Sequence, residues 1–147
     1  MRFWDASAIV PLLVSQQKTA AAASLRRQDP DMAVWWGTIV ECHSAIARVL
    51  RDRAIDRSGA ARGIERLSAI AAEWTEVEPS VGLRDAACRL LRAHPLHAAD
   101  ALQLAAALRL ADETGDRMEM ICFDDRLADA ARLERVMVID DQKGSRP

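Results

Sequence analysis

The sequence predicts an α/β protein, a three-layer α/β/α domain built on a short, mostly parallel sheet. Short apolar runs alternate along the chain with segments whose apolar residues recur every three or four positions, a pattern typical of parallel strands joined by helical crossovers. The composition agrees, because 50% of the residues are hydrophobic but only 4% are aromatic, which favours helices over an all-β core. With 147 residues, the chain has the usual size of one domain.

The first half of the chain alternates between strand and helix signals. Short apolar or alternating runs predict strands at residues 1–4, 32–36 and 74–78. Alanine-rich composition and apolar positions three and four residues apart predict helices at 7–14, 17–27, 38–50 and 58–72. The breaks between them fall at Asp29-Pro30, Gly37 and Pro79, because Pro and Gly end helices and strands.

The second half continues the same alternation. We expect helices at 81–93, 96–111 and 125–133 and strands at 118–123 and 136–139. Pro95 is expected to start the second of these helices, which ends near Gly115. We expect one domain over residues 1–140, followed by a polar C-terminal tail, 141–147, without regular structure.

The charge balance excludes one way of binding nucleic acid. The chain has 20 basic and 22 acidic residues, a formal net charge of −2. Such a protein does not attract RNA or DNA through its overall charge, as a polycation does. Any contact with RNA must therefore be local.

Cysteine usage and apolar patterning indicate a reducing compartment. The three cysteines, Cys42, Cys88 and Cys122, are odd in number and form no CxxC pair, so neither a disulfide framework nor a zinc ribbon is expected. We expect them to be buried thiols. The opening MRFWDAS has an acid where a signal peptide needs its apolar run, and no stretch approaches the roughly twenty apolar residues of a membrane span. We expect a soluble cytoplasmic protein with no membrane partner.

Acidic residues occur where the expected strands end. Asp5 follows the first strand, Asp124 follows the fourth, and Glu41 lies in the first turn of the helix after the second strand. The carboxyl ends of parallel strands meet at one edge of a sheet, where ligands gather. Asp100 lies in the helix expected at 96–111, among alanines and leucines. The sequence therefore predicts a carboxylate cluster at this edge.

Clustered carboxylates repel one another unless a cation lies between them. Mg²⁺ and Mn²⁺ prefer oxygen ligands, and such an ion can polarise a phosphodiester and activate water for attack. We therefore expect transfer of a phosphoryl group to water, with Asp5, Glu41, Asp100 and Asp124 as catalytic residues and metal ligands.

Each acid also has a purely structural interpretation. Asp5 and Asp124 could cap the helices that follow them. The run Thr38-Ile39-Val40-Glu41 matches a capping box, in which Glu41 would bond to the backbone N–H of Thr38. Taken together, four acids at one edge favour the functional interpretation.

Histidines and tryptophans offer weaker signals. The HxxHxxD run at residues 94–100 resembles a zinc ligand set, but a helix starting at Pro95 would leave His94 outside it. His43 has no second histidine at matching spacing and is interpreted as solvated or packed. The tryptophan pair at 35–36 could stack bases, although packing against a helix is the simpler interpretation.

Four segments together resemble the PIN-domain ribonucleases, specifically the VapC-type toxins of type II toxin-antitoxin modules. They are FWDASAIVPLL, WWGTIVECHSAIARVLR, HAADALQLAAALRLA and FDDRLADAARL, in the family's order and spacing over nearly the whole chain. The resemblance implies a PIN-like fold, with the family's four acids at Asp5, Glu41, Asp100 and Asp124. Ser7 matches a site-lining hydroxyl, whereas Cys122 replaces the usual Ser or Thr two residues before the fourth acid. Asp125 could share the role of Asp124.

The resemblance also implies a function and partners. It implies a Mg²⁺- or Mn²⁺-dependent endoribonuclease that forms a homodimer and acts on RNA. A cognate antitoxin would inhibit it by inserting a basic segment into the acidic site. One alternative is a phospho-accepting receiver or a phosphatase-like domain, which needs a lysine such as Lys18 or Lys143 near the acids. Another is a catalytically inactive PIN-like module that only binds partners.

Overall fold

The computed structural model describes residues 1–115 and 118–140 of the chain. The strands are β1 (Arg2–Trp4), β2 (Met32–Trp35), β3 (Thr75–Val77), β4 (Glu119–Ile121) and β5 (Met137–Ile139). The helices are α1 (Ala6–Leu13), α2 (Thr19–Gln28), α3 (Thr38–Arg51), α4 (Arg57–Ala71), α5 (Val81–Ala93), α6 (Ala98–Thr114) and α7 (Asp125–Leu133). Each strand and helix expected from the sequence is present, and the tail predicted at 141–147 lies outside the described residues.

The strands form a parallel sheet in the order β3-β2-β1-β4-β5. Each neighbouring pair in it is parallel, for example β1 with β4, where Phe3 is opposite Met120. The first three strands extend from the centre toward one edge, and the chain then returns to the other side of β1. The strand order therefore reverses between β1 and β4, and an open α/β sheet has its ligand crevice at such a position.

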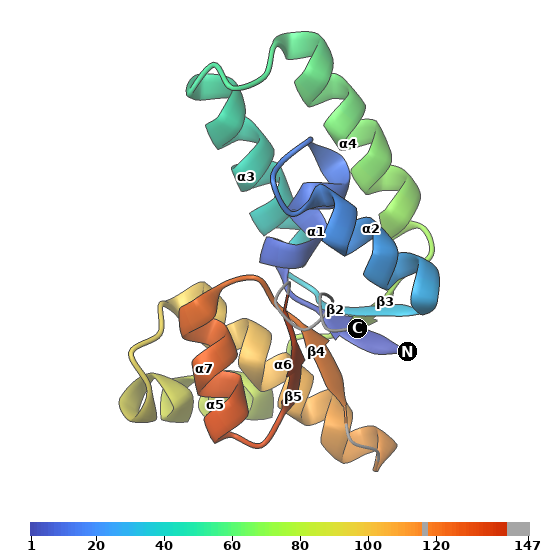
Figure 1. Cartoon of the computed structure of the whole chain (residues 1–147). Helices are drawn as coiled ribbons and strands as arrows, with labels where there is room; N and C mark the ends of the chain where they lie inside the picture. Colours follow the sequence, from blue (N-terminus) through green and yellow to red (C-terminus); the bar gives the residue numbers. More distant parts are fainter. Residues whose placement is uncertain (116–117, 141–147) are drawn as a thin grey trace.

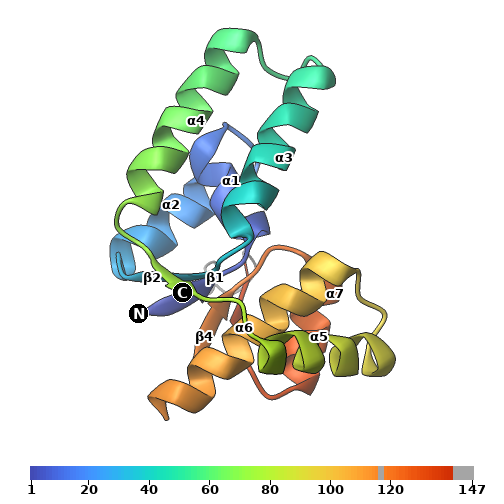
Figure 2. The same cartoon turned by 180° about the vertical axis from the view of Figure 1, so that it is seen from behind.

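Helices cover both faces of the sheet, as the sequence predicts. Helices α1 to α4 lie on one side and α5 to α7 on the other, and α3 and α4 run side by side away from the sheet (Figures 1 and 2). Neighbouring side chains in a strand point to opposite faces. Accordingly, Phe3 packs in the core beneath α5, α6 and α7, whereas Trp4 packs in the core beneath α1 to α4. The three-layer α/β/α fold is confirmed.

The start of α6 differs from the prediction. The helix begins at Ala98, with His97 as its N-cap, so Pro95 does not start it. Pro95 instead lies in a tight turn in which the N–H of Leu96 donates to the carbonyl of His94. The side chain of Asp100 accepts from the backbone N–H of His97 and thereby supports the later start. At the other end, Gly115 has φ 67°, a left-handed C-cap conformation that glycine adopts without strain.

Two further expectations can be compared with the structure. Cys42 and Cys122 are buried as predicted, but Cys88 is exposed because it lies on the outer face of α5. Among the described residues, no helix has the length and apolar character needed to cross a membrane.

Candidate active site

The four predicted acids line one cavity at the carboxyl edge of the sheet. This cavity has a volume of about 580 Å³, and its lining includes Asp5, Glu41, Asp100 and Asp124. Asp5 follows β1 and Asp124 follows β4, the two strands between which the strand order reverses. The fold thus brings together residues from four separate segments, and their roles in catalysis and metal binding stay predictions.

Asp5 is a helix cap and a cavity residue at once. It is the N-cap of α1, and its Oδ2 accepts from the backbone N–H of Ser7 at 2.9 Å and from the Ser7 hydroxyl. Only 4% of Asp5 is exposed, and this burial raises the pKa of its carboxyl group. The hydrogen bonds from Ser7 lower this pKa, while the charges of Asp100 and Asp124 raise it further. The capping interpretation is therefore correct, and the same carboxyl group also lines the cavity.

Ser7 and Cys122 lie beside the Asp5 carboxylate. The Ser7 hydroxyl oxygen accepts from the backbone N–H of Phe123, and Ser7 lines the cavity, as the resemblance implies. The Cys122 Sγ is 3.8 Å from Asp5 Oδ2 and donates to the carbonyl of Asp124 at 3.4 Å. Burial and the charge of Asp5 raise the pKa of the Cys122 thiol. A neutral, weakly donating thiol therefore occupies the place of the family's usual hydroxyl.

Glu41 is held by a residue of another helix rather than by a capping box. The N-cap of α3 is Gly37, not Thr38, and this cap makes no side-chain hydrogen bond to the start of the helix. Instead, Glu41 Oε1 accepts from Gln103 Nε2 at 3.0 Å. The pKa of Glu41 is raised to about 7, mainly by burial and also by the charges of Asp5 and Asp100, while the Gln103 hydrogen bond lowers it. The capping-box alternative is wrong because it needs Thr38 as the N-cap, whereas Thr38 is the first residue of the helix and Gly37 is the N-cap.

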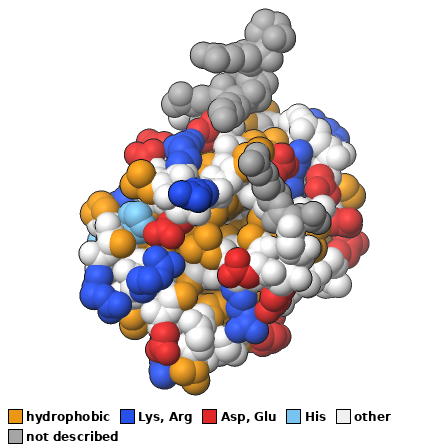
Figure 3. Space-filling model, turned by 90° about the horizontal axis from the view of Figure 1, so that it is seen from below, with side chains coloured by type: hydrophobic (Ala, Val, Ile, Leu, Met, Phe, Trp, Pro, Cys, Tyr) orange, Lys and Arg blue, Asp and Glu red, His pale blue; other side chains and the backbone are white. Residues whose placement is uncertain are grey.

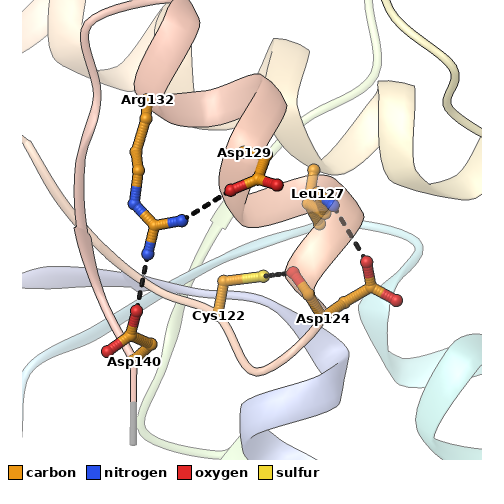
Figure 4. A network of polar contacts seen from close by, with 6 residues as sticks. All are labelled: Cys122, Asp124, Leu127, Asp129, Arg132 and Asp140. Carbon is orange, nitrogen blue, oxygen red and sulfur yellow. Dashed lines mark hydrogen bonds and ion pairs between the residues drawn. The ribbon is translucent and has the colours of Figure 1, made fainter. Parts of the chain in front are cut away.

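Asp124 caps α7 and faces the cavity. Its Oδ1 accepts from the backbone N–H of Leu127 at 2.9 Å (Figure 4). Asp125, the alternative for the fourth acid, is exposed and does not line the cavity. Farther along α7, Arg132 contacts Asp129 and also Asp140, which follows β5. The helix that Asp124 caps is therefore connected to the end of the sheet.

The zinc interpretation of residues 94–100 is not supported. His94 Nε2 lies 2.7 Å from Glu134 Oε1, and His97 Nε2 lies 2.9 Å from a guanidinium nitrogen of Arg126. The two imidazoles therefore have separate partners and do not converge on Asp100. His43 is exposed, which agrees with a solvated imidazole rather than a packed one.

The donor set of the cavity fits a hard divalent cation. Within residues 1–115 and 118–140, no three His, Cys, Asp or Glu side chains come close enough together to form a complete metal-binding group. Four carboxylates nevertheless line one cavity, and burial, together with repulsion from neighbouring carboxylates, raises the pKa values of Asp5 and Glu41. A cation offsets such repulsion, and carboxylate oxygens are the ligands that Mg²⁺ and Mn²⁺ prefer.

Sequence reasoning missed two residues near these acids. Arg48 lines the cavity, and Gln103 contacts Glu41. The spacing could have indicated both, because Arg48 lies two helical turns after Glu41 and Gln103 lies one turn after Asp100. The base-stacking hypothesis finds little support, since Trp35 is buried and Trp36, although 49% exposed, does not line the cavity.

Solved structures share this fold. PAE2754 from Pyrobaculum aerophilum has a TM-score of 0.66 and 20% identity, over 97% of this chain and 90% of that one. VapC20 of Mycobacterium tuberculosis has a TM-score of 0.63 and 16% identity, over 88% and 95%. FitAcB from Neisseria gonorrhoeae has a TM-score of 0.63 and 17% identity, over 95% and 96%. At these identities the likeness shows the fold alone.

Comparison with protein families is more decisive. No curated protein matches the chain in sequence. The PIN domain family matches residues 2–133, a range that contains the four cavity acids and the strands β1 to β4. The chain therefore belongs to the PIN domain family.

Proposed function

We propose that this protein is a Mg²⁺- or Mn²⁺-dependent endoribonuclease and the toxin of a toxin-antitoxin pair. The convergence of Asp5, Glu41, Asp100 and Asp124 on one cavity of about 580 Å³ is the observation that carries the proposal. Membership of the PIN domain family supports a nuclease. The structure of VapC20, which is similar in fold, is described as that of a sarcin-ricin loop cleaving toxin, and this supports RNA as the substrate.

The cavity residues have distinct roles in this proposal. Asp5, Glu41, Asp100 and Asp124 hold the cation, which when bound polarises a phosphodiester and lowers the pKa of water. Ser7 orients the Asp5 carboxylate with two hydrogen bonds, and the caps on α1 and α7 fix where Asp5 and Asp124 lie. Charged groups that are preorganised in this way do not have to rearrange during the reaction.

Binding of RNA must be local, since basic and acidic side chains are interspersed over the face seen in Figure 3. Arg48 is exposed, lines the acidic cavity and has no ion pair with the described residues. Its guanidinium is suited to a phosphate of the RNA backbone. We therefore assign substrate binding, rather than chemistry, to Arg48.

The same acidity favours a basic inhibitor. An antitoxin that supplies Arg or Lys side chains to the four carboxylates would neutralise them and displace the cation. The structure of VapBC2 from Rickettsia felis bound to a DNA fragment from its promoter contains a chain with a similar fold. The TM-score is 0.62 and the identity is 8%. The proposal includes the homodimer that the family resemblance implies and the cytoplasmic location expected from cysteine usage and apolar patterning.

The alternative of a receiver or a phosphatase loses its support. The chain belongs to a different family, and the Lys18 ammonium donates to the carbonyl of Phe123 at 3.2 Å while lying 5.2 Å from the centre of that residue's ring. Lys143, the other lysine considered, lies outside the described residues.

Cleavage of RNA by the purified protein tests the proposal. Incubation with total RNA should give discrete fragments with Mg²⁺ or Mn²⁺ and none with a chelator, and Asp5→Asn should give none under any condition. If the folded protein cuts no RNA with either ion, the result would instead support the inactive PIN-like interaction module.

A further inference from the structure

A glutamine lies in the core between two helices of the candidate site. Gln103 is 0% exposed and lies in α6, one turn after Asp100. Its Nε2 is 3.0 Å from Glu41 Oε1 and 3.0 Å from Thr38 Oγ1, both on α3. The neighbours of Gln103 along α6 are leucine and alanine, so this amide is a polar group in otherwise apolar surroundings.

The chemistry of these three groups fixes the direction of the amide. Nε2 carries two hydrogens, and each has an acceptor, one on Glu41 and one on Thr38. When Glu41 is ionised, as it must be to bind a cation, the reversed amide would place the carbonyl oxygen of Gln103 against a carboxylate oxygen, and the two would repel. Gln103 therefore donates to Glu41.

Packing alone does not account for a glutamine at this position. Its Oε1 is buried and, within the described residues, has no hydrogen-bond partner. Burying an unsatisfied carbonyl opposes folding, whereas an apolar side chain of similar size would avoid that cost. The donor nitrogen is the feature of Gln103 that an apolar residue lacks.

The hydrogen bond acts against the electrostatics of the cavity. Burial, and in addition the charges of Asp5 and Asp100, raise the pKa of Glu41 and so disfavour its ionised form. Repulsion of this kind drives a flexible carboxylate toward solvent. A neutral amide holds the carboxylate without cancelling its charge, whereas an Arg or Lys in the same place would compete with a cation for it.

We propose that Gln103 is a positioning residue that holds Glu41 in the carboxylate cluster for cation binding. The inference rests on the proposed function, since it assigns Gln103 a role in that site. Gln103 spans the two helix layers, because α3 lies on one side of the sheet and α6 on the other (Figure 1). Through it, α6 supplies Asp100 to the site and also orients a carboxylate of α3.

A double-mutant cycle with Mn²⁺ tests this role without relying on cleavage. The Mn²⁺ affinity of the full chain is measured calorimetrically for the wild type, Gln103→Met, Glu41→Ala and the double variant. Loss of an outer hydrogen-bond partner typically weakens metal binding by about tenfold or more, and this is expected for Gln103→Met. In the Glu41→Ala background, Gln103→Met should have no further effect beyond about twofold, because the carboxylate that it positions is absent.

Two controls separate positioning from helix packing. Leu104→Met changes an adjacent residue of α6 that is also 0% exposed, and it should leave Mn²⁺ affinity unchanged. Thr38→Val removes the other contact of the Gln103 amide while keeping the bond to Glu41. It should lower the thermal midpoint but change Mn²⁺ affinity by less than about twofold.

Specific results would overturn the inference. If Gln103→Met weakens Mn²⁺ binding equally with and without Glu41, the amide acts only on the fold. The same follows if Thr38→Val weakens Mn²⁺ binding as much as Gln103→Met does. If Gln103→Met does not fold, Gln103→Asn takes its place in the cycle, because its shorter side chain moves the donor nitrogen away from Glu41 while keeping an amide. Mn²⁺ binding by a wild type that cuts no RNA would count against the proposed function, while the cycle would still decide the role of Gln103.

Discussion

The backbone N–H of Phe123 donates to the hydroxyl oxygen of Ser7 across 2.9 Å. The same hydroxyl donates to Asp5, so a single oxygen atom joins the segment before Asp124 to the carboxylate that follows β1. An uncharged side chain thus fixes the position of Asp5 relative to the segment that carries Asp124, although the two are far apart in the sequence.

Replacing this hydroxyl should affect both stability and cation binding. In Ser7→Ala, the Phe123 N–H loses its acceptor and Asp5 loses one donor, which should cost about 1–3 kcal/mol of the free energy of unfolding. A higher Mg²⁺ concentration should also be needed for half-maximal cleavage. Urea denaturation and a Mg²⁺ titration measure the two effects. Ser44→Ala, at another cavity residue, is the matched control and should change neither.

Neutralising one acid should abolish cleavage without harming the fold. Asn caps a helix as well as Asp does, so Asp5→Asn keeps the start of α1, and the change removes a buried charge that Asp100 and Asp124 repel. The metal-free thermal midpoints of Asp5→Asn and Asp100→Asn should therefore equal or exceed that of the wild type. Calorimetry and an RNA cleavage assay check this. Cleavage at a near wild-type rate by either variant would show that the active site has been assigned to the wrong residues.

The metal-free protein should lose stability as the pH rises toward 7. Glu41 has an ordinary pKa of 4.5 and a pKa of about 7 in the folded protein, so over this range the folded state binds more protons than the unfolded state. The stabilisation is complete below pH 4.5 and is lost as the pH passes through about 7. Asp5, whose pKa is also raised, contributes with the same sign.

Urea midpoints measured across this range without metal test the dependence on pH. Glu41→Gln should flatten the profile, and saturating Mg²⁺ should oppose the loss because the cation binds the ionised carboxylates. An unchanged slope in Glu41→Gln would assign the effect to other groups.

Glu41→Gln also tests the catalytic role of this residue. The variant should stay folded and lose cleavage, since an amide is a much poorer ligand for Mg²⁺ than a carboxylate. High Mg²⁺ or Mn²⁺ should partly restore the rate, because mass action refills a weakened site. Cleavage measured across a metal titration decides the matter. A folded variant with full activity at low metal concentration would remove Glu41 from the site.

Arg48 should contribute to RNA affinity. Arg48→Ala should raise the KM for RNA and lower the slope of log affinity against log salt concentration by about one, as expected for the loss of one phosphate contact. The matched control is Arg51→Ala on the same helix, which removes an equal charge outside the cavity lining. Equal salt slopes in the two variants would contradict a local role for Arg48.

The acids could be predicted from the sequence because their positions follow from local rules. Asp5 and Asp124 come directly after strands or just beyond them, and parallel strands place such residues at one edge whatever the details of packing. Asp100 and Glu41 are recognisable as acids in helices that are otherwise apolar on the buried side. The family pattern depends on the same four positions.

The contacts between helices could not be predicted in this way. The bond between Gln103 and Glu41 depends on how α6 passes α3, and no periodicity encodes that distance. The capping box at Thr38 satisfied every local rule, yet Gly37 takes the N-cap position. Likewise, Pro95 is a good first residue for a helix, but the bond from the His97 N–H to Asp100 sets the start at Ala98 instead. In each case an interaction seen only in three dimensions decides between two locally acceptable structures.

The reversal of strand order between β1 and β4 has a consequence for the synthesis of the protein. Asp5 is synthesised before β4 and Asp124, because it precedes them in the chain. A nascent or truncated chain that stops before residue 119 has no strand on one side of β1 and no fourth acid. The cavity therefore forms only after β4 and Asp124 have been made. For a nuclease of the proposed kind, this order delays activity until strands have formed on both sides of β1.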